Sequence, residues 1–324
     1  MNEPITIVLP VYGRAELLAE ALHSVYGQSD PNWRLLIADD GSDSTTAALI
    51  ERQLDDPRVQ VVRRPHNVGL FANLDQAHRE ARTGWQLILC SDDRLESHAL
   101  ATLRACVAAH PSCGLVLSSY RSIDAVGNER FDVNGYHYDH FAPDTREFPP
   151  GALLEPLLRF GSINGNITGM LVRSALFEIT GPWRADWSQA ADWEWLIRAT
   201  LATSVLVQRQ PIAQVRVHAG QLSVSNRKLQ REGEEILQVL ASLLNQPALA
   251  SLPQRHRWAA HHAQFLLWNA LKAAPRVGML ATLRQLALIH RAVGLRRTGW
   301  AMLASVPQRF RIRGTDRPLP PPAR

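Results

Sequence analysis

The sequence predicts an α/β fold with a mainly parallel central sheet, and three features of its 324 residues carry that prediction. Short apolar or β-branched runs alternate with amphipathic stretches along the first half of the chain, as in proteins built from βαβ units. Two of these runs end abruptly in paired carboxylates, Asp39-Asp40 and Asp92-Asp93. Because ligands bind at the carboxyl ends of the strands in open α/β sheets, these acidic pairs indicate a binding edge.

Local patterns place the elements of this first half. Runs of strand length predict strands at Ile5–Val11, at Trp33–Ala38, at Val59–Val62, from Trp85 to the Asp92-Asp93 pair, and at Cys113–Ser118. Apolar spacing suited to amphipathic helices predicts helices between them, at Ala15–Tyr26, Ala47–Leu54, Leu70–Ala81 and Leu100–Ala109.

The second half of the chain is less regular. The segment 121–150 is rich in Asp, Asn, Gly, Tyr and Pro, which predicts a long loop or hairpin region. Further patterns predict helices at Leu153–Phe160 and Asp192–Ala202, a strand at Met170–Val172, and strand signals within Val205–Val217. From Leu229 the chain is expected to be helical, with breaks near Pro247, Pro253, Pro275 and Gly294.

Composition limits the class of protein. A hydrophobic content of 46% suffices for a sizeable core, and the three cysteines have neither a disulfide-rich nor a zinc-site pattern, which is typical of a reducing cytosol. We expect neither a signal peptide nor a transmembrane helix, because no basic region precedes an apolar stretch and no run of about 18 apolar residues occurs. The expected location is therefore cytoplasmic, and peripheral attachment to the inner face of the cell membrane stays open.

Six short motifs follow one another along about the first 220 residues: Leu9-Pro10-Val11-Tyr12-Gly13-Arg14, Ala38-Asp39-Asp40-Gly41-Ser42, Asn67-Val68-Gly69, Ser91-Asp92-Asp93, Asp192-Trp193-Glu194-Trp195-Leu196-Ile197-Arg198 and Val217-His218-Ala219-Gly220. Their order and spacing resemble the family-2 glycosyltransferases of the GT-A fold. The resemblance implies a nucleotide-sugar-dependent, hexosyltransferase-type enzyme that inverts the anomeric carbon. Relatives of this shape often build bacterial surface polysaccharides or glycoconjugates on saccharide or lipid-linked acceptors. We therefore predict a GT-A domain over residues 1–222, a helical extension over 223–313 and a disordered tail over 314–324.

The resemblance also implies a donor site at the predicted sheet edge. It assigns nucleotide binding to Pro10, Tyr12, Arg14, Asp39, Asp40, Asn67 and Asp92. The residue types suit this role, because a carboxylate accepts a base N–H and a tyrosine ring offers a stacking face. The alternative for Asp39 and Asp40 is turn and helix-capping chemistry.

A divalent ion is implied at the second acidic pair. Hard oxygen ligands suit Mg²⁺ or Mn²⁺, and the pair resembles the family's Asp-X-Asp motif with Ser91 in place of its first Asp. The resemblance implies Asp93 as the metal ligand, with His218 completing the metal or diphosphate site. The alternatives are a helix-capping pair and a structural histidine.

Asp192 is the implied catalytic base, because it matches the motif that carries the base in the family. At the start of its predicted helix the dipole favours the ionised carboxylate, as a base requires. Glu194 is the next candidate. The rival interpretation is a non-catalytic nucleotide-sugar-binding module, which Ala191 and Ser91 favour. Nucleic acid is not an expected partner, because no basic–aromatic module occurs.

The C-terminal part of the chain is strongly asymmetric in charge. No Asp or Glu occurs from Ile236 to Thr315, whereas Arg and Lys recur from Arg255 to Arg313 with Trp, Phe and Leu between them. Basic helices with such an apolar face can lie on an anionic membrane surface. The alternative is a helical core whose arginines are solvated outside. The sequence leaves both open, because it does not show which face is exposed.

Overall fold

The computed structural model describes residues 3–130, 137–218, 220–221 and 232–311, without the side chains of residue 232 and of residues 306–311. Several predictions fall outside this description. They are the boundary between residues 222 and 223, the tail over 314–324, the side chains of Arg309, Phe310 and Arg311, and all of Ala219 and Arg313.

The central sheet of the described chain has eight strands. They are β1 Ile5–Val11, β2 Trp33–Asp39, β3 Val59–Arg63, β4 Trp85–Ile88, β6 Cys113–Ser118, β9 Arg146–Phe148, β10 Leu171–Arg173 and β11 Ser204–Gln208. Their order is β3-β2-β1-β4-β10-β6-β11-β9. Neighbours from β3 to β4 pair in parallel, as do β6 and β11, whereas β10 and β9 run antiparallel to their neighbours. The predicted mainly parallel α/β sheet is confirmed.

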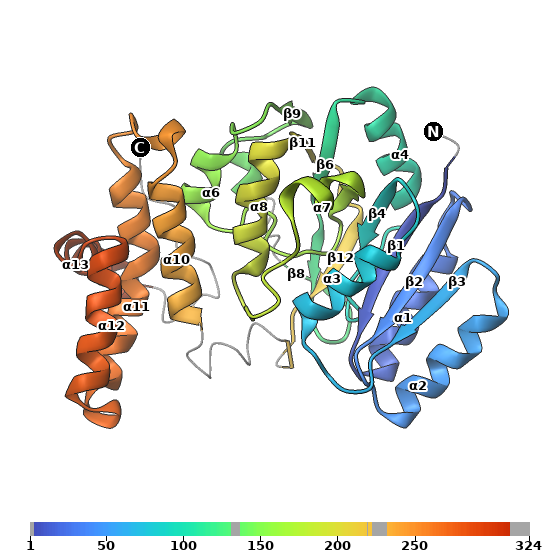
Figure 1. The fold of residues 1–324 in the computed structure, drawn as a ribbon, viewed down its shortest axis with the longest axis horizontal. Helices are drawn as coiled ribbons and strands as arrows, with labels where there is room; N and C mark the ends of the chain where they lie inside the picture. The colour runs from blue at the N-terminus through green and yellow to red at the C-terminus, as the bar shows by residue number, and fades with distance from the viewer. Residues whose placement is uncertain (1–2, 131–136, 219, 222–231, 312–324) are drawn as a thin grey trace. The chain divides into compact units, whose positions relative to one another are not determined.

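Most helices of the first part of the chain follow the predicted periodicity. They are α1 Ala15–Tyr26, α2 Ser44–Glu51, α3 Leu70–Glu80, α4 Ala99–Ala109 and α8 Ala191–Ala202, with the 3₁₀ turn η1 at Arg52–Asp55 (Figure 1). Helix α7 Ala175–Thr180 was not predicted. Helix α1 buries Leu18, Leu22 and Val25, the i, i+4, i+7 face that the sequence predicts. Helix α2 begins earlier than expected, because the Asp43 carboxylate caps the Thr46 N–H at 3.0 Å.

A second, smaller sheet has four strands in the described chain. They are β5 Arg94–Leu95, β7 Arg121–Ile123, β8 Glu129–Arg130 and β12 Ala213–Arg216, in the order β5-β12-β7-β8. Strands β7 and β8 form an antiparallel pair within the segment that was predicted as a loop or hairpin region. Strand β9, near the end of the same segment, pairs with β11 in the central sheet. Strand β12 pairs with β5, which follows the Asp92-Asp93 turn directly. This pairing brings residues 216–218 to that turn.

The chain divides into two compact units: Met1–Ala152 with Ile163–Ser225, and Leu153–Ser162 with Asn226–Arg324. The second unit is helical in its described part, as predicted for the C-terminal region. Its elements are α6 Leu154–Phe160, α10 Glu232–Leu244, the 3₁₀ turn η2 Pro247–Leu249, α11 Arg255–Val277, α12 Met279–Ala292 and α13 Leu295–Arg311. Helix α11 packs against α6, α10, α12 and α13. None of the helices in the described part of the chain combines the length and apolar character needed to cross a membrane.

The helical break expected near Pro275 occurs at Gly278. Helix α11 continues through Pro275 to Val277. A proline in the last turn of a helix removes one backbone hydrogen bond there without ending the helix. Gly278 ends it instead with a φ of 84°, a backbone conformation that favours glycine.

Candidate active site

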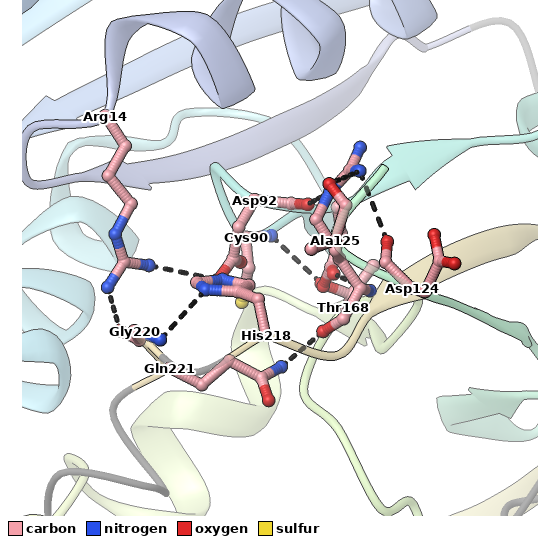
Figure 2. Close-up of polar contacts among 11 residues, drawn as sticks. Arg14, Cys90, Asp92, Asp124, Ala125, Thr168, His218, Gly220 and Gln221 are labelled. Carbon is pink, nitrogen blue, oxygen red and sulfur yellow. Dashed lines mark hydrogen bonds and ion pairs between the residues drawn. The ribbon is translucent and has the colours of Figure 1, made fainter. Parts of the chain in front are cut away.

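Arg14 connects the end of β1 to the Asp92-Asp93 turn. It precedes α1 with a left-handed backbone (φ 61°, ψ 56°), which non-glycine residues adopt at a cost on the order of 1–3 kcal/mol and mainly at functional sites. Its Nη1 donates to Asp92 Oδ2 at 3.3 Å, and its Nη2 donates to the carbonyl of Gly220 (Figure 2). The Arg14 side chain is 41% exposed and therefore remains accessible to a ligand.

His218 contacts the same carboxylate oxygen as Arg14. Its Nε2 lies 3.1 Å from Asp92 Oδ2, and the Gly220 N–H lies 3.2 Å from its Nδ1 (Figure 2). A backbone amide can only donate, so Nδ1 accepts and the proton of a neutral ring resides on Nε2. His218 thus donates to Asp92. Arg14, Asp92 and His218 form a connected group at the carboxyl ends of β1 and β4.

Asp92 and Asp93 have different environments. Asp93 is 1% exposed, and its two oxygens accept hydrogen bonds from Thr168 Oγ1 at 2.5 Å and from the Arg216 N–H at 2.8 Å. Burial, and secondarily the charge of Asp92, raise the pKa of Asp93 to about 8, although both hydrogen bonds oppose the shift. The Asp92 side chain is 18% exposed and faces Arg14 and His218. The geometry therefore favours Asp92 over Asp93 as the carboxylate that a ligand can reach.

Arg216 supports the turn formed by Asp92 and Asp93, called the acidic turn here. Its side chain is 2% exposed, and its Nε donates to the carbonyl of Asp92 at 3.0 Å. Its Nη1 donates to the carbonyl of Ala125 at 3.0 Å, and its Nη2 pairs with Glu20 Oε2 at 2.5 Å. The residue thus ties α1, the acidic turn and the β7–β8 connection together, and its backbone N–H reaches Asp93 as well.

Three side chains beside the acidic turn could hold a divalent ion. A thiol and two carboxylates, those of Cys90, Asp92 and Asp93, offer ligand atoms within 4.8 Å of one another. Burial raises the pKa of the Cys90 thiol well above its usual value, so the carboxylate oxygens are the suitable ligands for a hard cation. Adjacent carboxylates that repel each other are stabilised by such an ion. The residues fit a hard divalent ion on the Asp92 side; His218 can join it only by releasing one of its two hydrogen bonds.

The expected nucleotide residues lie along the ends of β1 and β2. Tyr12 is 59% exposed, so its ring is open to stacking, whereas Pro10 is buried in the sheet. Asp40 accepts from the N–H groups of Val68 at 2.7 Å and Gly69 at 3.0 Å. It therefore shapes the loop that precedes α3.

The neighbouring donor-site candidates also make local bonds. Asp39 accepts from the Ser42 N–H at 3.0 Å and lies 3.6 Å from Arg63 Nε. Asn67 accepts from the Gly69 N–H at 2.9 Å. The turn-forming contacts weighed for the Asp39-Asp40 pair are thus present.

Helix α8 carries the expected base. Asp192 is partly buried in its first turn, directly after the buried Ala191. Glu194, the second candidate, is held by Arg198 in a two-point ion pair of 2.9 and 2.7 Å. Arg198 also donates to the carbonyls of Thr180 and Pro182, so it anchors the segment before α8. The two-point ion pair engages both Glu194 oxygens and makes this residue a poor candidate for the base.

Thr168 and Arg216 are the contacts that sequence reasoning missed. Arg216 could have been noticed as a charged residue in an apolar strand pattern, two positions before His218. Thr168 carries no such signal. Its hydroxyl accepts from the Cys90 N–H and donates to Asp93, a contact made across 75 residues of sequence.

Comparisons with known proteins identify the family of the chain. A family model described as Glycosyl transferase family 2 matches residues 6–173, just over half of the chain. The chain therefore belongs to glycosyl transferase family 2, and the predicted family is confirmed. A Bacillus subtilis relative, named as a teichuronic acid biosynthesis glycosyltransferase (TuaG), is 30% identical over 97 residues, or 30% of this chain and 38% of the relative. The chain spans between 20% and 46% of the length of the first three curated relatives.

Two solved structures resemble the fold. Staphylococcus aureus TarS 1–349 in complex with UDP-GlcNAc has a TM-score of 0.66 at 16% identity, covering 94% of this chain and 92% of that one. The mannosyltransferase PcManGT from Pyrobaculum calidifontis, in complex with GDP-Man and Mn²⁺, has a TM-score of 0.56 at 18% identity, covering 98% and 89%. At these identities the likeness concerns the fold alone, and it confirms the predicted GT-A architecture.

Proposed function

We propose that this glycosyltransferase moves a sugar from a nucleoside diphosphate sugar to an acceptor hydroxyl with inversion at the anomeric carbon. The observation that carries the proposal is the meeting of Arg14, Asp92 and His218 at the carboxyl ends of β1 and β4. The family supports sugar transfer, and the name of the TuaG relative supports a place in surface polysaccharide or glycoconjugate synthesis. A saccharide or lipid-linked acceptor fits that setting.

The donor would lie across the ends of β1 and β2. In this proposal the exposed Tyr12 ring stacks on the base, and Asp39 accepts a base N–H. Arg14 would move from Asp92 to the donor diphosphate, because its guanidinium is exposed and phosphate oxygens suit its paired N–H groups. Asp92 would hold Mg²⁺ or Mn²⁺ with Asp93 or His218 beside it. The bound ion would neutralise charge on the leaving diphosphate.

Asp192 would remove the proton from the acceptor hydroxyl. Inversion requires the acceptor oxygen to attack the anomeric carbon from the face of the sugar opposite the leaving diphosphate. The base therefore acts on the side of the sugar where the acceptor binds. The α8 dipole favours the ionised carboxylate that this step needs. Glu194, the other candidate for the base, forms an ion pair with Arg198 and would keep that pair during the reaction.

A donor panel followed by two variants tests the proposal. Thermal shift with UDP-, GDP- and dTDP-sugars in the presence of Mn²⁺ identifies the donor, and product formation with that donor measures transfer and hydrolysis. Asp192→Asn should keep the donor-induced shift and lose roughly 10²–10⁴-fold in turnover. Asp92→Asn should lose the metal-dependent part of the donor affinity. Asp186→Asn, an exposed carboxylate paired with Arg184 just before α8, is the matched control.

The outcomes separate the two functions. Turnover of Asp192→Asn within about threefold of the parent would place the base elsewhere. A donor-induced shift without turnover on any sugar would favour the non-catalytic binding module. If Asp92→Asn keeps the metal-dependent part of the donor affinity and Asp93→Asn loses it, the metal ligand is the buried Asp93, as the sequence indicated.

A further inference from the structure

The last two helices expose large apolar side chains. On α12, Met279, Leu280 and Leu283 are each more than half exposed, and on α13 so are Trp300 and Leu303. A helix that packs on a protein core normally turns its largest apolar residues inward and its polar residues outward. These two helices reverse that pattern in part.

The inward faces of the same helices carry small hydroxyl residues. Thr282 on α12 and Thr298 and Ser305 on α13 are buried. The Thr282 and Thr298 hydroxyls donate to the carbonyls of Gly278 and Gly294 at 3.0 Å. Both bonds lie within the local helical turn, so the hydroxyls are satisfied without a partner on α11. Ile289 of α12 is buried as well, but Met279, Leu280 and Leu283 of the same helix stay exposed.

Cationic side chains share the exposed faces. On α12, Leu280, Leu283, Arg284 and Arg291 lie at helical spacings of three, four and eleven residues from Leu280, which places them on one stripe. They are exposed, whereas Ile289 on the opposite side is buried. On α13, Arg296, Trp300 and Leu303 form an equivalent stripe opposite Thr298. The basic apolar face is defined here by Met279, Leu280, Leu283, Arg284, Arg291, Arg296, Trp300 and Leu303.

We propose that the basic apolar face docks on an anionic lipid surface. Interfacial helices combine Leu and Trp, which enter the headgroup boundary, with Arg, which attracts anionic lipid. No acidic residue occurs from Ile236 to Thr315, so the sequence offers no negative charge there to oppose this attraction. Each basic residue near such a surface strengthens binding about fivefold. A second copy of this chain is a poor occupant, because two equally cationic faces would repel each other.

This inference goes beyond the proposed function, because docking needs neither the donor nor the acidic turn. If the acceptor is lipid-linked, docking would bring the enzyme to the surface that carries its substrate. The face lies wholly within the second compact unit, so its variants leave the residues of the candidate active site unchanged.

Vesicle flotation of the full chain tests the proposal. Vesicles of phosphatidylglycerol with phosphatidylcholine are compared with phosphatidylcholine alone, at low and high salt. The parent should float with the anionic vesicles at low salt only. The triple variant Leu280→Gln, Leu283→Gln, Trp300→Gln should stay in the soluble fraction. The double variant Arg284→Gln, Arg291→Gln should bind roughly 30-fold more weakly.

Controls distinguish docking from misfolding and from transfer. Ile179→Gln, which changes a 70% exposed apolar residue on α7, should float like the parent. All variants should keep the parent's melting temperature and donor-induced shift. If the triple variant melts at a lower temperature, the double variant Arg284→Gln, Arg291→Gln tests the proposal in its place. A failure of docking therefore leaves the proposed function standing, and the reverse also holds.

Four outcomes would overturn the proposal. A parent that stays soluble with anionic vesicles at low salt ends it, as does equal flotation with phosphatidylcholine alone. Full flotation of both face variants would place the lipid contact elsewhere. A parent that is dimeric in light scattering, with dimers lost in the triple variant and no flotation, would make a second copy the occupant.

Discussion

Replacing the buried Arg216 by methionine should destabilise the fold and loosen the acidic turn. The side chain of Arg216 is 2% exposed and makes bonds of 3.0 Å to the carbonyls of Asp92 and Ala125, besides its pair with Glu20. Methionine fills much of the volume and supplies no donor. Both carbonyls would then lose their buried guanidinium partner, while the arrangement of β12 would remain.

The magnitude follows from what the remaining groups can do. Removing one member of a buried ion pair costs about 3–5 kcal/mol when the other charge stays buried. Here the Glu20 side chain is 42% exposed and lies 3.4 Å from Arg94, so its charge is solvated and retains a partner. The cost then comes mainly from two carbonyls, at roughly 1–3 kcal/mol each, and the expected loss is about 2–6 kcal/mol. That is a large share of a typical folding free energy of about 5–15 kcal/mol.

Urea unfolding monitored by tryptophan fluorescence measures the loss, with an unchanged m-value as the sign of an unchanged unfolded state. Glu51→Gln is the matched control. It removes the charge of an exposed carboxylate that pairs with Arg63 and should cost only about 0–1 kcal/mol. A loss below about 1 kcal/mol in Arg216→Met, or an equal loss in Glu51→Gln, would refute the argument that the buried carbonyls carry the energy.

Three further outcomes are expected. Burial lowers the pKa of His78 to about 4, so at pH values between 4 and 6.5 the unfolded chain binds the proton more strongly than the folded one. The free energy of unfolding should therefore fall by up to roughly 3 kcal/mol as the pH drops from about 6.5 to 4. His78→Gln should flatten the curve of urea midpoint against pH. Asp40→Asn places an amide N–H₂ against the Val68 or Gly69 N–H and should cost about 1–3 kcal/mol and weaken donor binding in calorimetry. Mn²⁺ should raise the melting temperature of the parent but not of Asp92→Asn, and equal shifts would exclude Asp92 as a ligand.

Local pattern was sufficient for much of the framework. Helix α1 and strand β6 have the bounds that the sequence predicts, because each is specified by its own apolar periodicity. The Asp39-Asp40 pair lies at the carboxyl end of β2 as predicted, whereas β4 ends at Ile88 and the Asp92-Asp93 pair lies in the turn that follows it. The parallel sheet followed from the alternation of these elements, and the ordered motifs indicated the family.

Tertiary structure decided the pairing of strands and the roles of neighbouring residues. Strand β10 runs antiparallel between β4 and β6, and no local pattern sets the direction of a strand relative to partners far away in sequence. Asp92 and Asp93 are chemically identical in sequence, yet Thr168 and the Arg216 N–H bond the carboxylate of Asp93, whereas Arg14 and His218 bond that of Asp92. The contact between Arg216 and Asp92 spans 124 residues, so only folding brings these groups together.

The C-terminal helices separate the two kinds of information most clearly. Their helical periodicity and their lack of acidic residues are properties of the sequence, and they alone determine the cationic character of this region. Which face is buried is not determined by hydrophobicity here, because Thr298 faces inward and Trp300 faces outward. Packing against α11 selects small residues for close approach, and a sequence read one helix at a time does not contain that constraint.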